Sequence, residues 1–203
     1  MSFPEELDGE TPIVEEVFFL KKTMTAALLV LASLLFSRAA LAQQDATWVL
    51  DSSTLSYHIS HPIHEVDGVS HAALGKGICQ AGQCNFLIAA PVKSFNSGDS
   101  NRDLHMLQVT KGAQFPMVTV RLRLPQSDLN SPRLLCDLQV QFAGQTANYK
   151  NVPFDQKISG AEHTISGVVP STLTDFKIDP PSFLTVPIKN EIPVKVEMSW
   201  HPA

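Results

Sequence analysis

The sequence has little charge, and its positive charge is nowhere concentrated. Only 17% of the 203 residues are charged, with 15 Lys and Arg against 20 Asp and Glu, and no basic cluster exceeds the pair Lys21-Lys22. Nucleic-acid binding needs a basic patch or stripe, so the sequence argues against that class of function. Because 44% of the residues are hydrophobic, the chain can bury a sizeable core, and its length suits one ordinary domain.

The motifs of common enzyme classes are also missing. The sequence contains no Gly-x-Ser-x-Gly elbow and no His-Glu-x-x-His helix, and Gly75-Lys76 lacks the remaining residues of a phosphate loop. Arg102 and Asp103 stand at the start of a predicted helix, where an acid interacts favourably with the free N–H groups, so we assign them a structural role. His105 on the same helix is expected to fix it to the rest of the domain. We therefore expect a protein that is not an enzyme, with no catalytic residues and no cofactor.

No apolar run is long enough to cross a membrane as a helix. The longest mostly apolar run, Met24 to Phe36, has thirteen residues, whereas a spanning helix needs about 20. It follows Lys21-Lys22 and precedes Ala40-Leu41-Ala42, which together are typical of a cleavable signal peptide. We expect residues 1–42 to be removed after Ala42, leaving residues 43–203 in the periplasm or outside the cell with no transmembrane anchor.

The first nineteen residues do not suit a signal peptide. They carry six acidic side chains and no basic one, whereas a signal peptide begins with a basic region. A mis-called start explains them better than a functional extension does. In this interpretation Leu20 is encoded by a non-standard start codon, and translation begins there.

Cysteine is scarce but informatively placed. Cys79 and Cys84 flank a turn marked by Gly82, so they can face each other across a hairpin and form a disulfide in an exported compartment. Their spacing excludes a C-x-x-C redox pair and a haem attachment motif. Cys136 lies within an apolar alternation, so we expect a buried small hydrophobic side chain.

The dominant pattern of residues 43–203 has a period of two, which is typical of strands with one dry face and one wet face. The clearest cases are residues 118–124, 134–142 and 194–198, and further strands are predicted within 48–50, 55–59, 72–79, 84–89, 146–154 and 163–169. One short helix is predicted over Asn101 to Thr110, after the capping candidates Asp99 and Ser100. About eight one-sided antiparallel strands must close into a barrel or pack as a sandwich, and periodicity does not choose between them.

Residues 96–121 carry a more specific signal. The string from Asn96 to Leu107, continued by Gln114 to Arg121, resembles the central signature of the YceI-like family of lipid- and polyisoprenoid-binding proteins. Trp48 to Ser56 is similar to that family's opening strand, and His64 to Gly68 to its His-then-Gly segment. The resemblance spans roughly residues 46–200, and the sequence departs from it at the Cys79/Cys84 pair and the His-rich segment.

The resemblance implies an exported, extended, lipocalin-like antiparallel β-barrel whose apolar pore takes a polyisoprenoid or fatty-acid-like chain. The function expected from it is to sequester or transport such an amphiphile, and a homodimer is left open as its assembly. Alternation selects the side chains that should line the pore: Phe86, Ile88, Val118, Val120, Leu122, Leu138, Val140, Phe142, Val194 and Val196. Phe115 and Phe176 are candidates for a mouth or constriction.

Four histidines support a rival hypothesis, an exported metal- or haem-binding redox or enzymatic protein. They are His58, His61, His64 and His71. On a single strand His58 and His64 would lie about 20 Å apart with His61 on the opposite face, so we expect no metal site unless the chain kinks at Pro62. A third hypothesis is a filled barrel that binds a partner protein.

Overall fold

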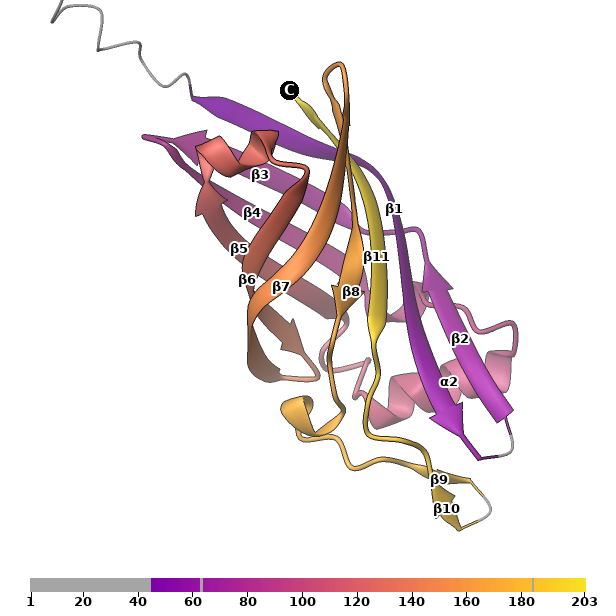
Figure 1. Cartoon of the computed structure of the whole chain (residues 1–203). Coiled ribbons are helices and arrows are strands. Elements are labelled where there is room, and N and C mark those ends of the chain that lie inside the picture. The colour runs from indigo at the N-terminus through magenta and orange to yellow at the C-terminus, as the bar shows by residue number, and fades with distance from the viewer. Residues whose placement is uncertain (1–44, 63, 184) are drawn as a thin grey trace, which may run out of the picture. The chain divides into compact units, whose positions relative to one another are not determined.

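A computed structural model describes residues 45–62, 64–183 and 185–203, so the predicted signal peptide and start site lie outside the described residues. Figure 1 shows the elements in chain order: β1 (Ala46–His61), β2 (His64–Ser70), β3 (Leu74–Gln80), β4 (Gln83–Pro91), η1 (Val92–Ser94), α2 (Ser100–Val109), β5 (Met117–Pro125), η2 (Gln126–Asn130), β6 (Arg133–Phe142), β7 (Gln145–Ser159), β8 (Glu162–Val169), η3 (Thr174–Phe176), β9 (Ser182–Phe183), β10 (Val186–Pro187) and β11 (Val194–Pro202). None of the described helices is long and apolar enough to cross a membrane.

Eight strands close into an antiparallel barrel. The order is β11-β8-β7-β6-β5-β4-β3-β1, and β1 also pairs with β11, which completes the ring. Strand β2 lies outside this ring on the edge of β1. The predicted all-β barrel with one short helix is confirmed, and closure decides between the barrel and the sandwich that periodicity left open.

Strand β1 joins two of the predicted strands into one and spans both halves of the barrel. A bulge at Asp51 shifts its pairing with β11, since Leu50 pairs with Trp200 and Ser52 with Ser199. On its other side, residues 46–49 pair with β3 and residues 55–61 pair with β2. The bulge lets so long a strand bend around the barrel without losing its pairing.

The histidine-rich segment is a hairpin, not one continuous strand. His61 pairs with His64 and His58 with Asp67, so the chain reverses at Pro62. The predicted separation of His58 and His64 along a single strand is therefore wrong. Residues 64–70 form a strand that the sequence analysis did not recognise as one.

The helix and its preceding loop are held by local hydrogen bonds. Asp99 caps α2 by accepting from the backbone N–H groups of Asn101 at 2.9 Å and Arg102 at 3.2 Å. Asp103 accepts from the backbone N–H of Ser97 at 3.0 Å, and the Arg102 guanidinium donates to the Ser97 carbonyl at 2.9 Å. These contacts support the structural role predicted for both residues. His105, however, is exposed, so the expectation that it fixes the helix to the barrel is wrong.

The cysteines occupy the positions that the sequence predicts. Cys79 and Cys84 pair across the β3–β4 hairpin and form a disulfide, and both are fully buried. The two-residue turn between the strands is Ala81-Gly82, with φ of 49° and 78°, a conformation that glycine adopts at low cost. Cys136 is a free, buried thiol on β6.

Candidate functional site

The barrel encloses a cavity of about 260 Å³. Inward-facing side chains from every barrel strand except β3 line it, together with residues of η1, α2, η2 and η3. Strand β3 presents Gly75 and Gly77 to the interior instead, where the rings of Trp200 and Phe86 lie over them. The interior is therefore hollow, as a chain-binding pore requires.

All ten residues that alternation predicts for the pore line this cavity. The reason is the two-residue period, since residues such as Val118, Val120 and Leu122 must face the same side of their strand. That these side chains contact a ligand stays a prediction.

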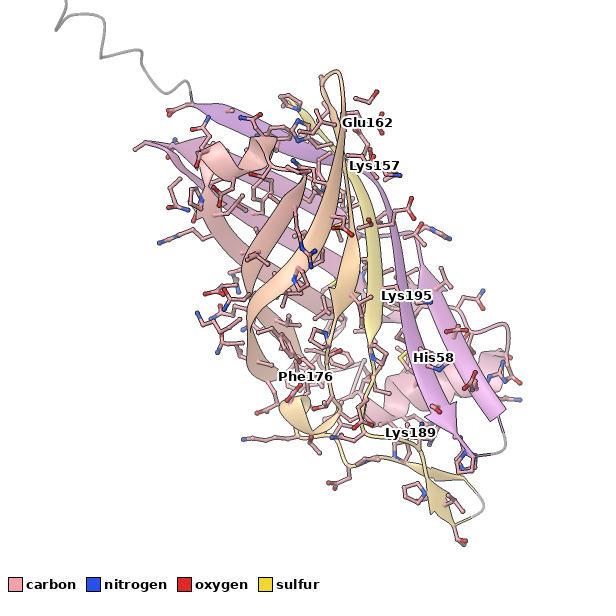
Figure 2. All side chains as sticks on the ribbon, in the orientation of Figure 1. His58, Lys157, Glu162, Phe176, Lys189 and Lys195 are labelled. Carbon is pink, nitrogen blue, oxygen red and sulfur yellow. A yellow bond between two sulfur atoms is a disulfide. The ribbon has the colours of Figure 1, made fainter. Side chains whose placement is uncertain are left out.

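Of the two aromatic candidates for a mouth or constriction, only one lines the cavity. Phe176 is buried, lines the cavity, and packs edge to face on Phe142 with ring centroids 5.3 Å apart. Phe115 does not line it and lies against Gly144 in the β6–β7 turn. Figure 2 shows Phe176, the last residue of η3, towards the end of the barrel opposite Glu162.

The cavity has further lining residues that the sequence analysis missed. Some lie on β1 and β11, where alternation could have found them: Trp48, Leu55, Tyr57, Ile59, Met198 and Trp200. Others, such as Met106, Leu129 and Leu173, come from the helix and from short turns. No periodic signal marks these, because the three-dimensional course of the chain alone brings them to the barrel.

The two ends of the cavity differ in exposure. At the closed end, near the β7–β8 hairpin, the lining residues are buried: Trp48, Leu129, Gln156, His163 and Trp200. The 3-10 helix η2 is tied to this end, since the Gln156 amide donates to the carbonyls of Leu129 at 2.7 Å and Ser131 at 2.9 Å. At the opposite end, called here the mouth end, half-buried residues line the cavity beside buried ones. The half-buried residues are Tyr57, Ile59, Met106, Thr172 and Leu173, and the buried ones are Val92, Thr110, Ser171 and Phe176.

A short segment around η3 lies against the N-terminal half of β7. Strand β7 pairs with β8 only through residues 154–159, so residues 145–152 have no strand partner on the β8 side. There the Tyr149 hydroxyl donates to an Asp175 carboxylate oxygen at 2.7 Å. Burial and this hydrogen bond raise the pKa of Tyr149. Partial burial acts to raise the pKa of Asp175, but hydrogen bonds from Tyr149 and Thr172 outweigh it and lower that pKa.

The cavity is uncharged. Its lining contains no Asp, Glu, Lys or Arg side chain among the described residues. Burial lowers the pKa of His163, which favours the neutral ring, and burial, followed by Asp128 and Asp137, raises the pKa of the Cys136 thiol to about 11. Such a site offers solvent exclusion to an apolar chain.

Among the described residues, no three His, Cys, Asp or Glu side chains are placed to hold an ion, and the side chain of His64 lies outside the described ones. His58 contacts Asp67, with 3.0 Å between Nδ1 and Oδ1. The His71 ring lies 3.2 Å from the Ser53 carbonyl. His61 is buried.

Neither a protein-family model nor a curated protein matches the sequence. Solved structures do match. A polyisoprenoid binding domain from Saccharophagus degradans, implicated in plant cell wall breakdown, superposes with a TM-score of 0.63 at 12% identity over 77% of this chain and 98% of its own. BcnA from Burkholderia cenocepacia gives 0.62 at 15% identity over 72% and 95%. A YceI protein from Campylobacter jejuni gives 0.45 at 14% identity over 57% and 70%. The two stronger matches show that the chain has the fold of these proteins.

Proposed function

We propose that the protein binds a polyisoprenoid or fatty-acid-like amphiphile in its barrel cavity and sequesters or transports it after export, without catalysing a reaction. The observation that carries the proposal is the hollow, uncharged interior, lined almost entirely by apolar side chains. A barrel of about eight strands has room either for a solid core or for one small ligand, and this one keeps the space open.

Burial of hydrocarbon is sufficient to retain such a ligand. An isoprene unit has five carbons, and at ~0.8 kcal/mol for each buried group it contributes about 3 to 4 kcal/mol before ordering costs. The cavity of about 260 Å³ has room for roughly nine groups at ~30 Å³ each. One isoprene unit and most of a second therefore fit inside, and a longer chain would extend through the mouth end.

Two further lines of support point to the same ligand class. The Saccharophagus degradans domain that shares the fold is described as polyisoprenoid-binding. The sequence from Asn96 to Arg121 resembles the signature of the YceI-like lipid-binding family. In the structure, Ser97 of this segment is hydrogen-bonded to Arg102 and Asp103 of α2, and Met106 of α2 lines the cavity.

The test is to express the full chain with its own leader, purify it from the exported fraction, extract it with organic solvent and identify the extract by mass spectrometry. A long-chain lipid in stoichiometric amount is the expected result. The control is the same protein unfolded, stripped of lipid and refolded, which should take up an added polyprenol. Lipid-free exported protein whose refolded form takes up none would contradict the proposal and favour a partner-binding module.

The export step has its own readout. We propose cleavage after Ala42, so that the mature chain begins at Gln43, and a buried Cys79–Cys84 disulfide is what an oxidising compartment would produce. N-terminal mass spectrometry of the exported protein should find this end. Precursor peptides from residues 2–16 would refute a start at Leu20. Native mass spectrometry of the same sample distinguishes a monomer from a homodimer.

A further inference from the structure

Three polar side chains at the closed end of the cavity each leave one atom without a hydrogen-bond partner. Trp48, Gln156 and His163 come from β1, β7 and β8, line the cavity, and are 7%, 6% and 9% exposed. Within the described part of the chain, the indole Nε1, the amide Oε1 and the imidazole Nδ1 have no partner. Buried polar atoms in native proteins are nearly always paired, so three of them at one end of a ligand cavity call for an explanation.

The orientation of the Gln156 amide is fixed by its other atom. Nε2 donates to the carbonyls of Leu129 and Ser131, at 2.7 Å and 2.9 Å. Turning the amide over would set Oε1 against two carbonyl oxygens, so Oε1 remains the unpaired atom. It is a hydrogen-bond acceptor.

Trp48 and His163 supply the complementary groups. Their rings lie edge to face, with centroids 4.6 Å apart and planes at 74°. The indole N–H is a donor only, whereas the imidazole Nδ1 donates or accepts according to its tautomer. The three atoms can therefore be satisfied by a single group that both accepts and donates hydrogen bonds.

The absence of charge from the described lining of the cavity limits which ligand head groups can bind at this end. Burial lowers the pKa of His163, and no charged side chain lines the cavity among the described residues. A carboxylate or phosphate at this end would be buried without a counter-charge, which is very unfavourable. A hydrocarbon end would leave all three protein atoms unpaired. An uncharged hydroxyl meets both conditions.

We propose that the closed end binds the hydroxyl of a long-chain alcohol, so that the ligand lies with its polar end innermost and its hydrocarbon chain directed towards the mouth end. The indole N–H of Trp48 and the Nδ1–H of His163, in that tautomer, donate to the hydroxyl oxygen, and Gln156 Oε1 accepts the hydroxyl hydrogen. Because all three atoms are shielded in the structure, contact with the hydroxyl requires side chains at the closed end to move. The inference rests on the proposed function and adds to it the head group and the direction of the chain.

The test compares three probes that share one chain: farnesol, farnesene and farnesyl diphosphate. Each competes with the fluorescent probe N-phenyl-1-naphthylamine for the lipid-stripped, exported protein. Farnesol should bind at least about tenfold more tightly than farnesene, and more tightly than the diphosphate, because only the alcohol satisfies the buried groups. Equal affinities for farnesol and either of the others would overturn this inference and leave the proposed function standing. Failure of all three to bind would overturn the proposed function itself.

Variants locate the selectivity at the closed end. His163→Phe and Trp48→Phe keep an aromatic ring but remove one unpaired atom each, so either should weaken farnesol binding by about five- to tenfold and leave farnesene unchanged. Tyr149→Phe is the matched control. Tyr149 lies on β7, the strand of Gln156, but does not line the cavity, and its hydroxyl is paired with Asp175 and is not among the three unpaired atoms. If it lowers the farnesol preference as much as Trp48→Phe does, or if neither test variant lowers it, the assignment is wrong. Circular dichroism identifies the variants that fold. The farnesol preference of either test variant, if that variant folds, is enough to decide whether the assignment holds.

Discussion

Filling the cavity from its wall should abolish chain binding without unfolding the barrel. Val140 lies on β6, pairs with Val120 across the sheet, lines the cavity and is 7% exposed. Replacing it with Phe adds roughly four carbons, which at ~30 Å³ each occupy nearly half of the 260 Å³ cavity. A ligand then buries about four carbons fewer. At ~0.8 kcal/mol for each, the loss is about 3 kcal/mol, or roughly a hundredfold in the dissociation constant.

The assay is displacement of N-phenyl-1-naphthylamine by farnesol, measured on Val140→Phe and on Gln139→Phe as its matched control. Gln139 neighbours Val140 on the same strand but points outward, so the control adds the same ring without reaching the cavity. The control should bind farnesol like the wild type. Both variants should remain folded, with changes in unfolding free energy no larger than about 1 to 3 kcal/mol. If a folded Val140→Phe protein binds farnesol with unchanged affinity, the ligand does not occupy this cavity.

Three further predictions concern stability and reactivity. Replacing Cys79 and Cys84 together by Ser should lower the unfolding free energy by about 2 kcal/mol, since the disulfide closes a loop of sequence separation 5, and denaturant unfolding measures it. Tyr149→Phe should cost about 1 kcal/mol, because the hydrogen bond to Asp175 is largely exposed. The folded-state pKa of Asp175 is lowered, so the stability that Asp175 contributes is present above the ordinary carboxyl pKa of 3.8 and is lost as the pH falls through the folded-state pKa. In Tyr149→Phe, the unfolding free energy should therefore depend less on pH between pH 7 and pH 3 than it does in the wild type. The thiol of Cys136, with a pKa raised to about 11, should resist iodoacetamide at pH 8 in the folded protein and react after unfolding, so rapid labelling of the native state would show that it is not buried.

Much of the barrel wall could be predicted because strand periodicity is local. Once residues 118–124 form a strand, Val118, Val120 and Leu122 must share a face, and the face is the inner one because its outer neighbours are polar. The helix cap at Asp99 and the Cys79–Cys84 pair also depend only on neighbouring residues. These features needed no knowledge of the tertiary structure.

The features that could not be predicted from the sequence depend on contacts between residues far apart in the chain. The reversal at Pro62 was not predicted, because the alternation in residues 64–70 is weak and polar residues cover its outer face. Closure of the ring needs β1 to pair with β11, elements at opposite ends of the domain. Gln156 and His163 lie on the adjacent strands β7 and β8, but Trp48 on β1 joins them only because the ring closes.

Intermolecular nuclear Overhauser effects between methyl-labelled valines and a bound polyprenol test the central claim most directly. The account predicts contacts from the polyprenol chain to the cavity valines, and none to Val168, which is exposed on β8. The cavity valines are Val118, Val120, Val140, Val194 and Val196. Contacts confined to Val168, with the cavity valines unaffected, would show that the lipid lies on the outside of the barrel and would contradict the account.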